Sequence, residues 1–479
     1  MGTNDRLRSG ARSIVSIAQS APCYLGMLYC AGIVHWVWFF LFAQLQGLDW
    51  RLTAGYQAVL RDALTRFRIP YVSTFLYYTD RYLGTPETPL SPQFLLTPWL
   101  SPWVFNVLNI CLLYTAAFAG LLLLRRRYRL SRAPFALLFL LFNFNGYLVS
   151  RVGVGHTMWY GYFFLPFFYL FLLELFDRPD DRRLVVLLTG VLAAIELQGS
   201  FHLYVWCVMY LMLTALFAWR LFRPLAIVTI WASLLCAFRF VPTAVTFTGA
   251  ILECKQGYPT LGSLLDSLIA LATPAWVSPD SETGWWELDC FVGAIGLGLV
   301  GWFAVVYPHN APSKWYSDRW ALILAAACMA VFAMDGMYQP IFNLSIPFLD
   351  SQRVPTRFIV MPLTVCITLA AIQMQRFLDS EETRPVARWM LALALILVAA
   401  GLYRHSAGWT VREVELRAWE NWRRPVERIA VLDPDMTNPG MRTYVHAVWA
   451  SSVFSLALAA HWFYRLLRTR ARQTSSAGN

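Results

Sequence analysis

Residues 21–43, APCYLGMLYCAGIVHWVWFFLFA, form an apolar run that leads into the sequence Gly47-Leu48-Asp49-Trp50. About 20 apolar residues are enough for a helix to cross the hydrocarbon core of a membrane. The run therefore predicts a first membrane-spanning helix, with Asp49 at the membrane surface just beyond it. A carboxylate in that place has three candidate roles: general base, metal ligand, or cap of the helix that follows.

The composition indicates a membrane protein. Hydrophobic residues make up 58% of the 479 residues and charged residues only 14%, whereas soluble proteins carry about a quarter charged residues. The formal net charge of +11 agrees with basic cytoplasmic loops, so it does not require nucleic acid as a partner. The nine cysteines form no CxxC pair and most lie inside apolar runs, so we interpret them as small hydrophobic residues.

Apolar runs of span length recur along the chain and predict an all-α polytopic membrane protein with about 12 transmembrane helices. Lys and Arg concentrate in alternate connections, which we assign to the cytoplasm together with both termini. Residues 1–20 are then a cytoplasmic N-terminal segment. The predicted spans are 21–43, 102–124, 133–150, 157–176, 184–199, 201–219, 224–247, 289–307, 319–334, 356–375, 388–403 and 444–464.

The long polar connections fall together on the outer face of the membrane. They are residues 44–101, 244–288, 335–355 and 404–443. Within the last of these, residues 410–432 predict an amphipathic helix, interrupted by proline, that lies on the membrane or packs over the other loops. This one-sided polar mass differs from the midplane sites and related halves that are usual in transporters.

Several stretches on that outer face resemble the GT-C superfamily of membrane glycosyltransferases, in particular bacterial members that use a polyprenyl-phosphate-linked sugar. The first loop is similar to the family's pattern of an Asp after helix 1, a surface helix, Pro/Gly-rich turns and a closing Ser-Pro. In this sequence the pattern falls on Asp49, residues 54–68, Gly84-Thr85-Pro86 and Ser101-Pro102. Later similarities are Gly155-His156 with Pro166, GSFHLYVW at 199–206, GWWELDCFVG at 284–293 and RVPTRF at 353–358.

The resemblance implies a GT-C-like fold and divides the chain into two parts. Residues 21–375 would form the transmembrane catalytic region, with external loop 44–101 and amphipathic helices in the external loops. Residues 376–479 would form variable C-terminal helices, with external loop 404–443 and a basic cytoplasmic tail. The first loop lacks a tandem acidic pair such as Asp-Glu, and there is no large soluble C-terminal domain, so the resemblance favours transfer of a single sugar over N-linked oligosaccharide transfer.

The implied reaction needs a carboxylate that takes the proton of the attacking hydroxyl, and cations that stabilise the leaving phosphate. The resemblance assigns the base role to Asp49, with helix capping as the alternative. Asp80, in an aromatic setting with Tyr77 and Tyr78, is a second acidic candidate whose alternative is a solvated turn. The candidate ligands of the donor phosphate are Arg353, Arg357, Arg239, His156 and Arg151.

Each phosphate candidate also has a structural alternative. Arg239 could pair with Glu196, and the arginines of RVPTRF could anchor loop carboxylates. Three residues are supporting or acceptor-binding candidates besides Asp80, namely Glu196, His202 and Glu287. A divalent cation, Mg²⁺ or Mn²⁺, held with help from Glu287 and Asp289 is left open, because hard cations need several oxygen ligands that a sequence cannot assemble.

The sequence thus predicts an inverting glycosyltransferase of the plasma (inner) membrane, with its active site on the periplasmic or extracellular side. Its partners would be a polyprenyl-linked sugar donor, a glycan, lipid or protein acceptor, and membrane lipids. One alternative is a flippase or transporter of lipid-linked glycans that uses the same arginines. Another is an O-antigen polymerase or ligase, whose chemistry would lie on the late-loop residues Arg404, His405, Arg412 and Arg417.

Overall fold

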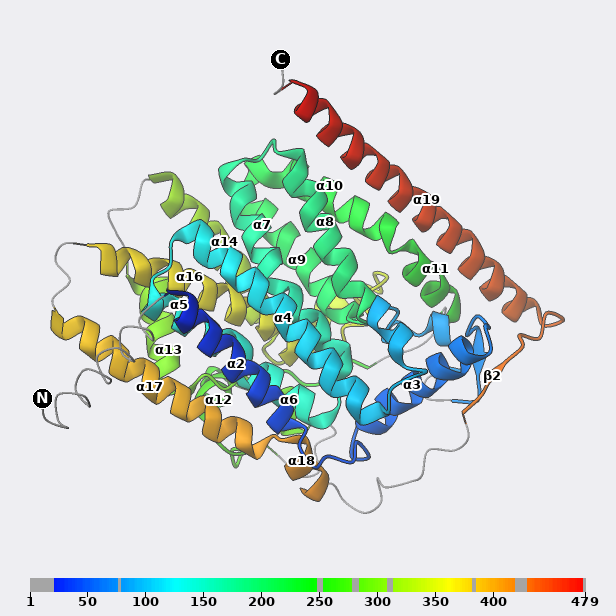
Figure 1. Ribbon diagram of the computed structural model, residues 1–479, viewed down its shortest axis with the longest axis horizontal. Helices are drawn as coiled ribbons and strands as arrows, with labels where there is room; N and C mark the ends of the chain where they lie inside the picture. The colour runs from blue at the N-terminus through cyan, green and yellow to red at the C-terminus, as the bar shows by residue number, and fades with distance from the viewer. Residues whose placement is uncertain are drawn as a thin grey trace, which may run out of the picture.

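The structure is a computed structural model that describes residues 21–75, 79–247, 253–277, 284–307, 313–380, 385–417 and 429–476. Within these ranges the chain is a helical bundle with one pair of short antiparallel strands (Figure 1). The predicted cytoplasmic segment 1–20, Tyr77 and Tyr78 beside Asp80, and residues 418–428 of the predicted amphipathic helix lie outside the described residues.

The elements follow one another in two halves of the chain. The first half contains α2 (Ala21–Phe39), α3 (Trp50–Thr65), β1 (Val72–Ser73), η1 (Tyr82–Gly84), η2 (Pro92–Leu96), α4 (Pro102–Tyr128), α5 (Arg132–Phe144), α6 (Gly146–Val154), η3 (Thr157–Phe164), α7 (Leu165–Asp177), α8 (Arg182–Leu197) and α9 (Phe201–Phe217). The second half contains η4 (Trp219–Leu221), α10 (Phe222–Leu235), α11 (Ala237–Thr246), α12 (Leu261–Ile269), η5 (Trp285–Glu287), α13 (Gly293–Gly301), η6 (Trp302–Val306), α14 (Ser313–Phe332), α15 (Gln339–Phe342), η7 (Pro355–Ile359), α16 (Val360–Asp379), α17 (Pro385–Gly408), α18 (Val411–Arg417), β2 (Val431–Leu432) and α19 (Pro439–Ser476).

Seven described helical segments are long and apolar enough to cross a membrane, and the pair α10–α11, bent by 67°, makes an eighth if it is counted as one span. The chain is therefore an all-α, multi-pass membrane protein. The seven are Pro22–Phe39, Pro102–Tyr128, Arg132–Val154, Thr157–Asp177, Pro355–Asp379, Pro385–Gly408 and Pro439–Trp462.

The predicted count of 12 spans is not confirmed, although every predicted apolar run coincides with one or more helices. The shortfall has a physical reason. Helices α8, α9 and α13–η6 have 16, 17 and 14 residues, which is short of the roughly 20 needed to span the hydrocarbon core. Helix α14 begins with the charged sequence SKWYSDR.

The helices differ in how deeply they lie in the bundle. In the span Pro355–Asp379, which contains α16, 89% of the most apolar stretch is buried inside the bundle. The corresponding shares for the spans on α2, α17 and α19 are only 17%, 22% and 28%. Exposed large apolar side chains such as Trp389 and Ile396 line α17. Helix α16 therefore lies at the centre of the bundle, and α2, α17 and α19 present apolar surface suited to lipid.

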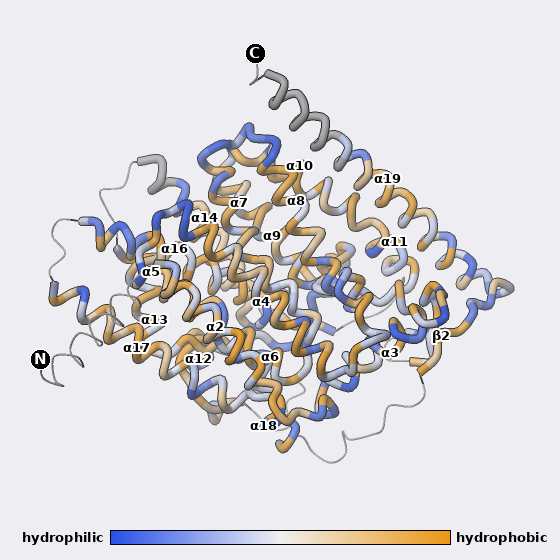
Figure 2. The backbone as a smooth tube through the Cα atoms, in the orientation of Figure 1, coloured by the Kyte–Doolittle hydropathy of each residue, from blue (hydrophilic) through white to orange (hydrophobic). Residues whose placement is uncertain are grey.

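The two ends of the bundle carry different polar groups, while hydrophobic residues dominate the helices between them (Figure 2). At one end, basic residues that follow or precede the spans pair with acids on neighbouring helices, as in Arg127–Asp177 and Arg220–Asp318. The other end holds the long connections, where β1 of the first loop pairs with β2 of the last through Val72 and Leu432. The first and last long connections thus form one folded layer.

The two ends should be accessible from opposite sides of the membrane. We expect cysteines at the exposed positions Arg126 and Arg178 to react with a membrane-impermeant maleimide only from one side, and cysteines at Gln46 and Asp433 only from the other. Exposed Cys30 would be replaced by Ser in every variant. Labelling of intact and of inverted membrane vesicles measures this, and reaction of both pairs from the same side would contradict the arrangement.

Candidate functional site

Asp49 stands at the N-cap position of α3, but its side chain makes no capping hydrogen bond. Its Oδ2 instead lies 2.7 Å from Nε2 of His156, and its backbone N–H donates to the carbonyl of Val154 at 3.0 Å. The Asp49 side chain is 29% exposed, whereas His156 is 5% exposed. The capping role considered from the sequence is therefore not what this side chain does in the structure.

The turn that carries His156 requires glycine at position 155. Gly155 has φ +90°, and a Cβ there would lie 2.3 Å from the backbone nitrogen of Trp50. Two further bonds fasten this turn to α3, because the Trp50 indole donates to the Gly153 carbonyl and the Thr53 hydroxyl donates to the Gly155 carbonyl. The close contact between α3 and the α6–η3 turn is what brings Asp49 to His156.

The hydrogen bonds of His156 fix its tautomer. The indole N–H of Trp159 lies 3.3 Å from His156 Nδ1, and an indole nitrogen can only donate. Nδ1 therefore accepts, and Nε2 carries the proton that is donated to Asp49. This bond occupies one carboxylate oxygen of Asp49, and Oδ1 makes no hydrogen bond with any other described side chain.

Glu287 connects His156 to a pair of arginines. Its carboxylate accepts two hydrogen bonds from Arg357, one of them from Nε at 2.8 Å, and its Oε1 lies 3.9 Å from His156 Nδ1. Arg151 is fully buried, donates to the Glu287 carbonyl at 3.0 Å and lies 3.8 Å from its carboxylate. Burial acts to raise the pKa of Glu287, but the charge and hydrogen bonds of Arg357, and then the charge of Arg151, outweigh it and hold the pKa well below its usual range.

A second cluster surrounds His202, which was a supporting candidate from the sequence, although its partners in the structure were not. Its Nδ1 lies 2.9 Å from Gln352 Oε1, and its Nε2 lies 3.2 Å from Glu87 Oε1. Trp206 also donates to Gln352 Oε1, so that oxygen is the acceptor. Both ring nitrogens of His202 therefore lie against oxygen acceptors.

Glu87 is the acid that sequence analysis missed as a site residue. Burial acts to raise its pKa, but the hydrogen bond with His202 and the charges of His202, Arg357 and Arg353 lower the pKa below its ordinary value. The sequence signal was slight, a single acid after Gly84-Thr85-Pro86. The two clusters are joined by Trp159, which lies under the Arg357 guanidinium at 4.9 Å and stacks on Trp206 at 5.1 Å.

Arg239 does not face this site. Its NH2 donates at 2.9 Å to each of the carbonyls of Thr85, Pro86 and Thr88, and its Nε lies 3.7 Å from a carboxylate oxygen of Glu196. Both charged residues are buried. The structure therefore places Arg239 as the anchor of the loop that carries Glu87, with Glu196 as the ionic partner that the sequence analysis named as the alternative.

Of the remaining residues named from the sequence, one belongs to the cluster and the others lie elsewhere. Arg353 is partly exposed and contributes its positive charge to Glu87. Asp80 lies in the turn after β1, where its side chain accepts from Thr79. His405 is not in an external loop, because α17 continues to Gly408, and it is buried against Asp289 at 2.9 Å. The cluster that the structure assembles consists of Asp49, His156, Glu287, Arg357, Arg151, Glu87, His202 and Arg353.

The cluster does not form a prepared metal site. Among the described residues, no group of three or more His, Cys, Asp or Glu side chains is arranged to hold a metal ion. Of the two acids named for that role, Glu287 already binds Arg357 through both oxygens, and Asp289 Oδ2 lies 2.9 Å from His405 Nε2. Comparisons of the chain with protein-family models, with curated proteins and with solved structures found no match.

Gly155→Ala should destabilise the protein by at least about 1–3 kcal/mol, because alanine disfavours a positive φ and its Cβ would collide with Trp50. Thermal unfolding of the purified protein in detergent measures the loss. Gly190→Ala is the matched control, since a Cβ on that α8 glycine meets nothing within 4 Å. Equal melting temperatures for the two variants would contradict the role of Gly155.

Glu287→Gln should destabilise the protein by about 3–5 kcal/mol at pH 7, because it leaves buried arginines without their counter-charge. The pKa of Glu287 is lower in the folded than in the unfolded chain. Its carboxylate therefore stabilises the fold fully above the unfolded value of about 4.3, and this contribution is lost as the pH falls towards the folded value.

The acid dependence of unfolding tests the same assignment. The stability of the wild type should fall below about pH 4, and that of Glu287→Gln should fall less over the same interval. Exposed Glu253 provides the control variant Glu253→Gln, which should follow the wild type. Identical acid profiles for wild type and Glu287→Gln would refute the assignment.

Proposed function

We propose that the chain is an inverting membrane glycosyltransferase of the GT-C type, which transfers a sugar from a polyprenyl-phosphate-linked donor to a hydroxyl of a glycan, lipid or protein acceptor. The observation that carries this proposal is the Asp49–His156 pair at 2.7 Å. It combines a partly exposed carboxylate with a cationic cluster, at the end of the bundle where the long loops fold together.

Asp49 is the general base in this proposal. Its Oδ1 accepts the proton of the acceptor hydroxyl as the oxygen attacks the anomeric carbon, and the bond from carbon to the donor phosphate breaks on the opposite face. His156 donates to Oδ2 and so keeps the carboxylate oriented. Because Trp159 fixes the His156 tautomer, Asp49 keeps this partner throughout the step.

The cations beside Asp49 stabilise the leaving phosphate. Arg353 is the main phosphate ligand in the proposal, because it is partly exposed and its charge reaches the site. Arg357 is held in place by Glu287 and is the second ligand. Arg151 and Arg239 are positioning residues, since both are buried and donate hydrogen bonds to backbone carbonyls.

The proposed location is the plasma (inner) membrane, with both termini in the cytoplasm and the site on the periplasmic or extracellular side. The basic turns at the opposite end of the bundle support this orientation, since cytoplasmic loops are enriched in Lys and Arg. The described residues offer no prepared cation site, so no step of the mechanism passes through Mg²⁺ or Mn²⁺.

Asp49→Asn should lower the rate of sugar transfer by about 10²- to 10⁴-fold, which is the usual contribution of a general base. Purified protein in detergent, a polyprenyl-phosphate sugar and mass spectrometry of the product provide the measurement. Exposed Asp433 of the same outer layer supplies the control, and Asp433→Asn should retain full activity. Full transfer by Asp49→Asn would remove Asp49 from the mechanism.

The same assay separates a transferase from a flippase of lipid-linked glycans. A flippase moves its substrate between leaflets, so the wild-type protein would form no transfer product in detergent. Absence of product with every polyprenyl-linked donor, together with donor movement across vesicles, would favour the flippase and reject the proposal.

A further inference from the structure

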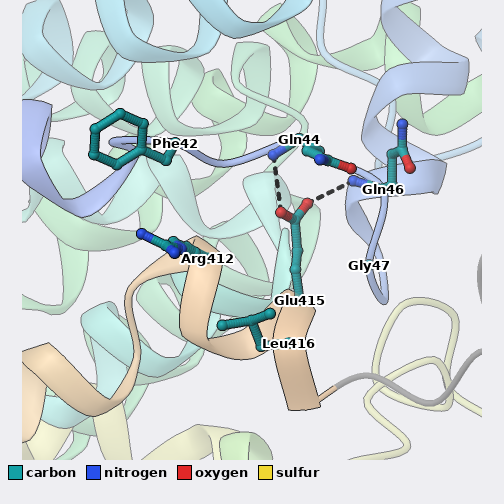
Figure 3. Close-up of a pocket in the computed structure, with 7 residues that line it drawn as sticks. All are labelled: Phe42, Gln44, Gln46, Gly47, Arg412, Glu415 and Leu416. Carbon is teal, nitrogen blue, oxygen red and sulfur yellow. Dashed lines mark hydrogen bonds between the residues drawn. The ribbon is translucent and has the colours of Figure 1, made fainter.

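A cavity of about 550 Å³ opens between the segment after α2 and the short helix α18, two residues before Asp49 (Figure 3). Small-molecule sites in proteins commonly have volumes of about 300–1,000 Å³. The cavity is lined by Phe42, Gln44, Gln46, Gly47, Arg412, Glu415 and Leu416.

Most polar groups of this cavity remain available for a ligand. Figure 3 shows the Glu415 carboxylate reaching from α18 to the backbone N–H groups of Gln44 and Gln46, at 2.8 and 2.7 Å. A carboxylate has about four acceptor sites, so about two remain. The side-chain amides of Gln44 and Gln46 and the guanidinium of Arg412 form no hydrogen bond with other described residues.

The cavity also has an apolar face and a constrained backbone. Phe42 is 72% exposed, with the Arg412 guanidinium 5.7 Å from its ring centre. Phe42, Leu45 and Leu48 have φ values of 63°, 59° and 47°, a region that non-glycine residues adopt at a cost and mainly at functional sites. The two bonds from Glu415 help to hold the segment in this conformation.

We propose that this cavity is the acceptor subsite and that the acceptor is a carbohydrate, an inference that rests on the proposed glycosyl transfer. A sugar presents hydroxyl groups that both donate and accept, and two carboxamides, a carboxylate and a guanidinium supply the complementary groups. Its C–H face can pack on the Phe42 ring. The ionised groups lining the cavity, Arg412 and Glu415, sum to no net charge, which suits a neutral polyol better than an anionic lipid headgroup.

The position of the cavity agrees with this role. Gly47 lines it, and the Cα atoms of residues 47 and 49 are at most about 7 Å apart because each residue spans no more than about 3.6 Å. A sugar unit bound against Gly47 therefore lies within about one sugar length of Asp49. The segment 42–47 would bind the acceptor, and Asp49 would activate the hydroxyl that protrudes from it.

The test uses the full chain in lipid nanodiscs and an array of oligosaccharides released from bacterial cell envelopes, without any donor. We expect binding to a subset of these glycans, weakened at least tenfold in the double variant Gln44→Ala/Gln46→Ala and in Phe42→Ala. These side chains are exposed, so the variants should fold, and their melting temperatures should match the wild type. Gln339→Ala, an exposed glutamine on α15, is the matched control and should bind normally.

Binding to no glycan, or binding that the cavity variants leave unchanged, would overturn the inference. So would binding to phosphatidylglycerol vesicles that Arg412→Gln abolishes, because the cavity would then be a lipid site. The donor-free array keeps this test separate from the proposed function. If the protein binds glycans but transfers no sugar, the proposed transferase activity is rejected while the glycan-binding cavity stands. If the protein transfers sugar and Gln44→Ala/Gln46→Ala leaves the KM for the acceptor unchanged, the acceptor subsite is rejected while the transferase stands.

Discussion

The buried ion pair between Glu287 and Arg357 is the interaction on which the candidate site depends. Removing two charges from water is costly, and such a pair persists only where hydrogen bonds satisfy both partners. Here Arg357 binds both oxygens of the carboxylate, while the Glu287 carbonyl accepts from Arg151 and Thr356. Glu287 of η5 thus links α6 and η7 through its hydrogen bonds. Because α6 ends in the turn that carries His156, these hydrogen bonds also fix the position of His156, the partner of Asp49.

The features that depend on local chain properties, such as the positions of the helices, were predictable from the sequence. Apolar runs form helices wherever they occur, so all predicted runs coincide with helices, and the alternation of basic and long connections agrees with the two ends of the bundle. Asp49, His156, Glu287 and Arg357 were each named beforehand, and the structure gathers them. The number of spans was less predictable, because the bend between α10 and α11 and the shortness of α8 and α9 depend on packing against neighbours.

The sequence could not predict which charged groups pair with which. His202 meets Glu87 across 115 residues and Gln352 across 150, and no local pattern links such positions. Arg239 is a partial exception. A charged residue inside a predicted span indicates a cavity or a partner, and the sequence offered Glu196 as that partner beside a phosphate ligand. The fold shows that Arg239 lies near Glu196 and adds the carbonyls of the Thr85–Thr88 turn, which no sequence pattern indicated.

The C-terminal part of the chain, where the family resemblance fades, is not separate from the site. Helix α19 packs along α11 (Figure 1), β2 pairs with β1, and Glu415 of α18 holds the backbone just before Asp49. Asp49 itself is held by the α6–η3 turn, and the segment that leads to it is held by α18. In the proposed function the early part of the chain supplies the reacting groups, and the late part contributes to acceptor binding because α18 forms one wall of the cavity that Gly47 lines.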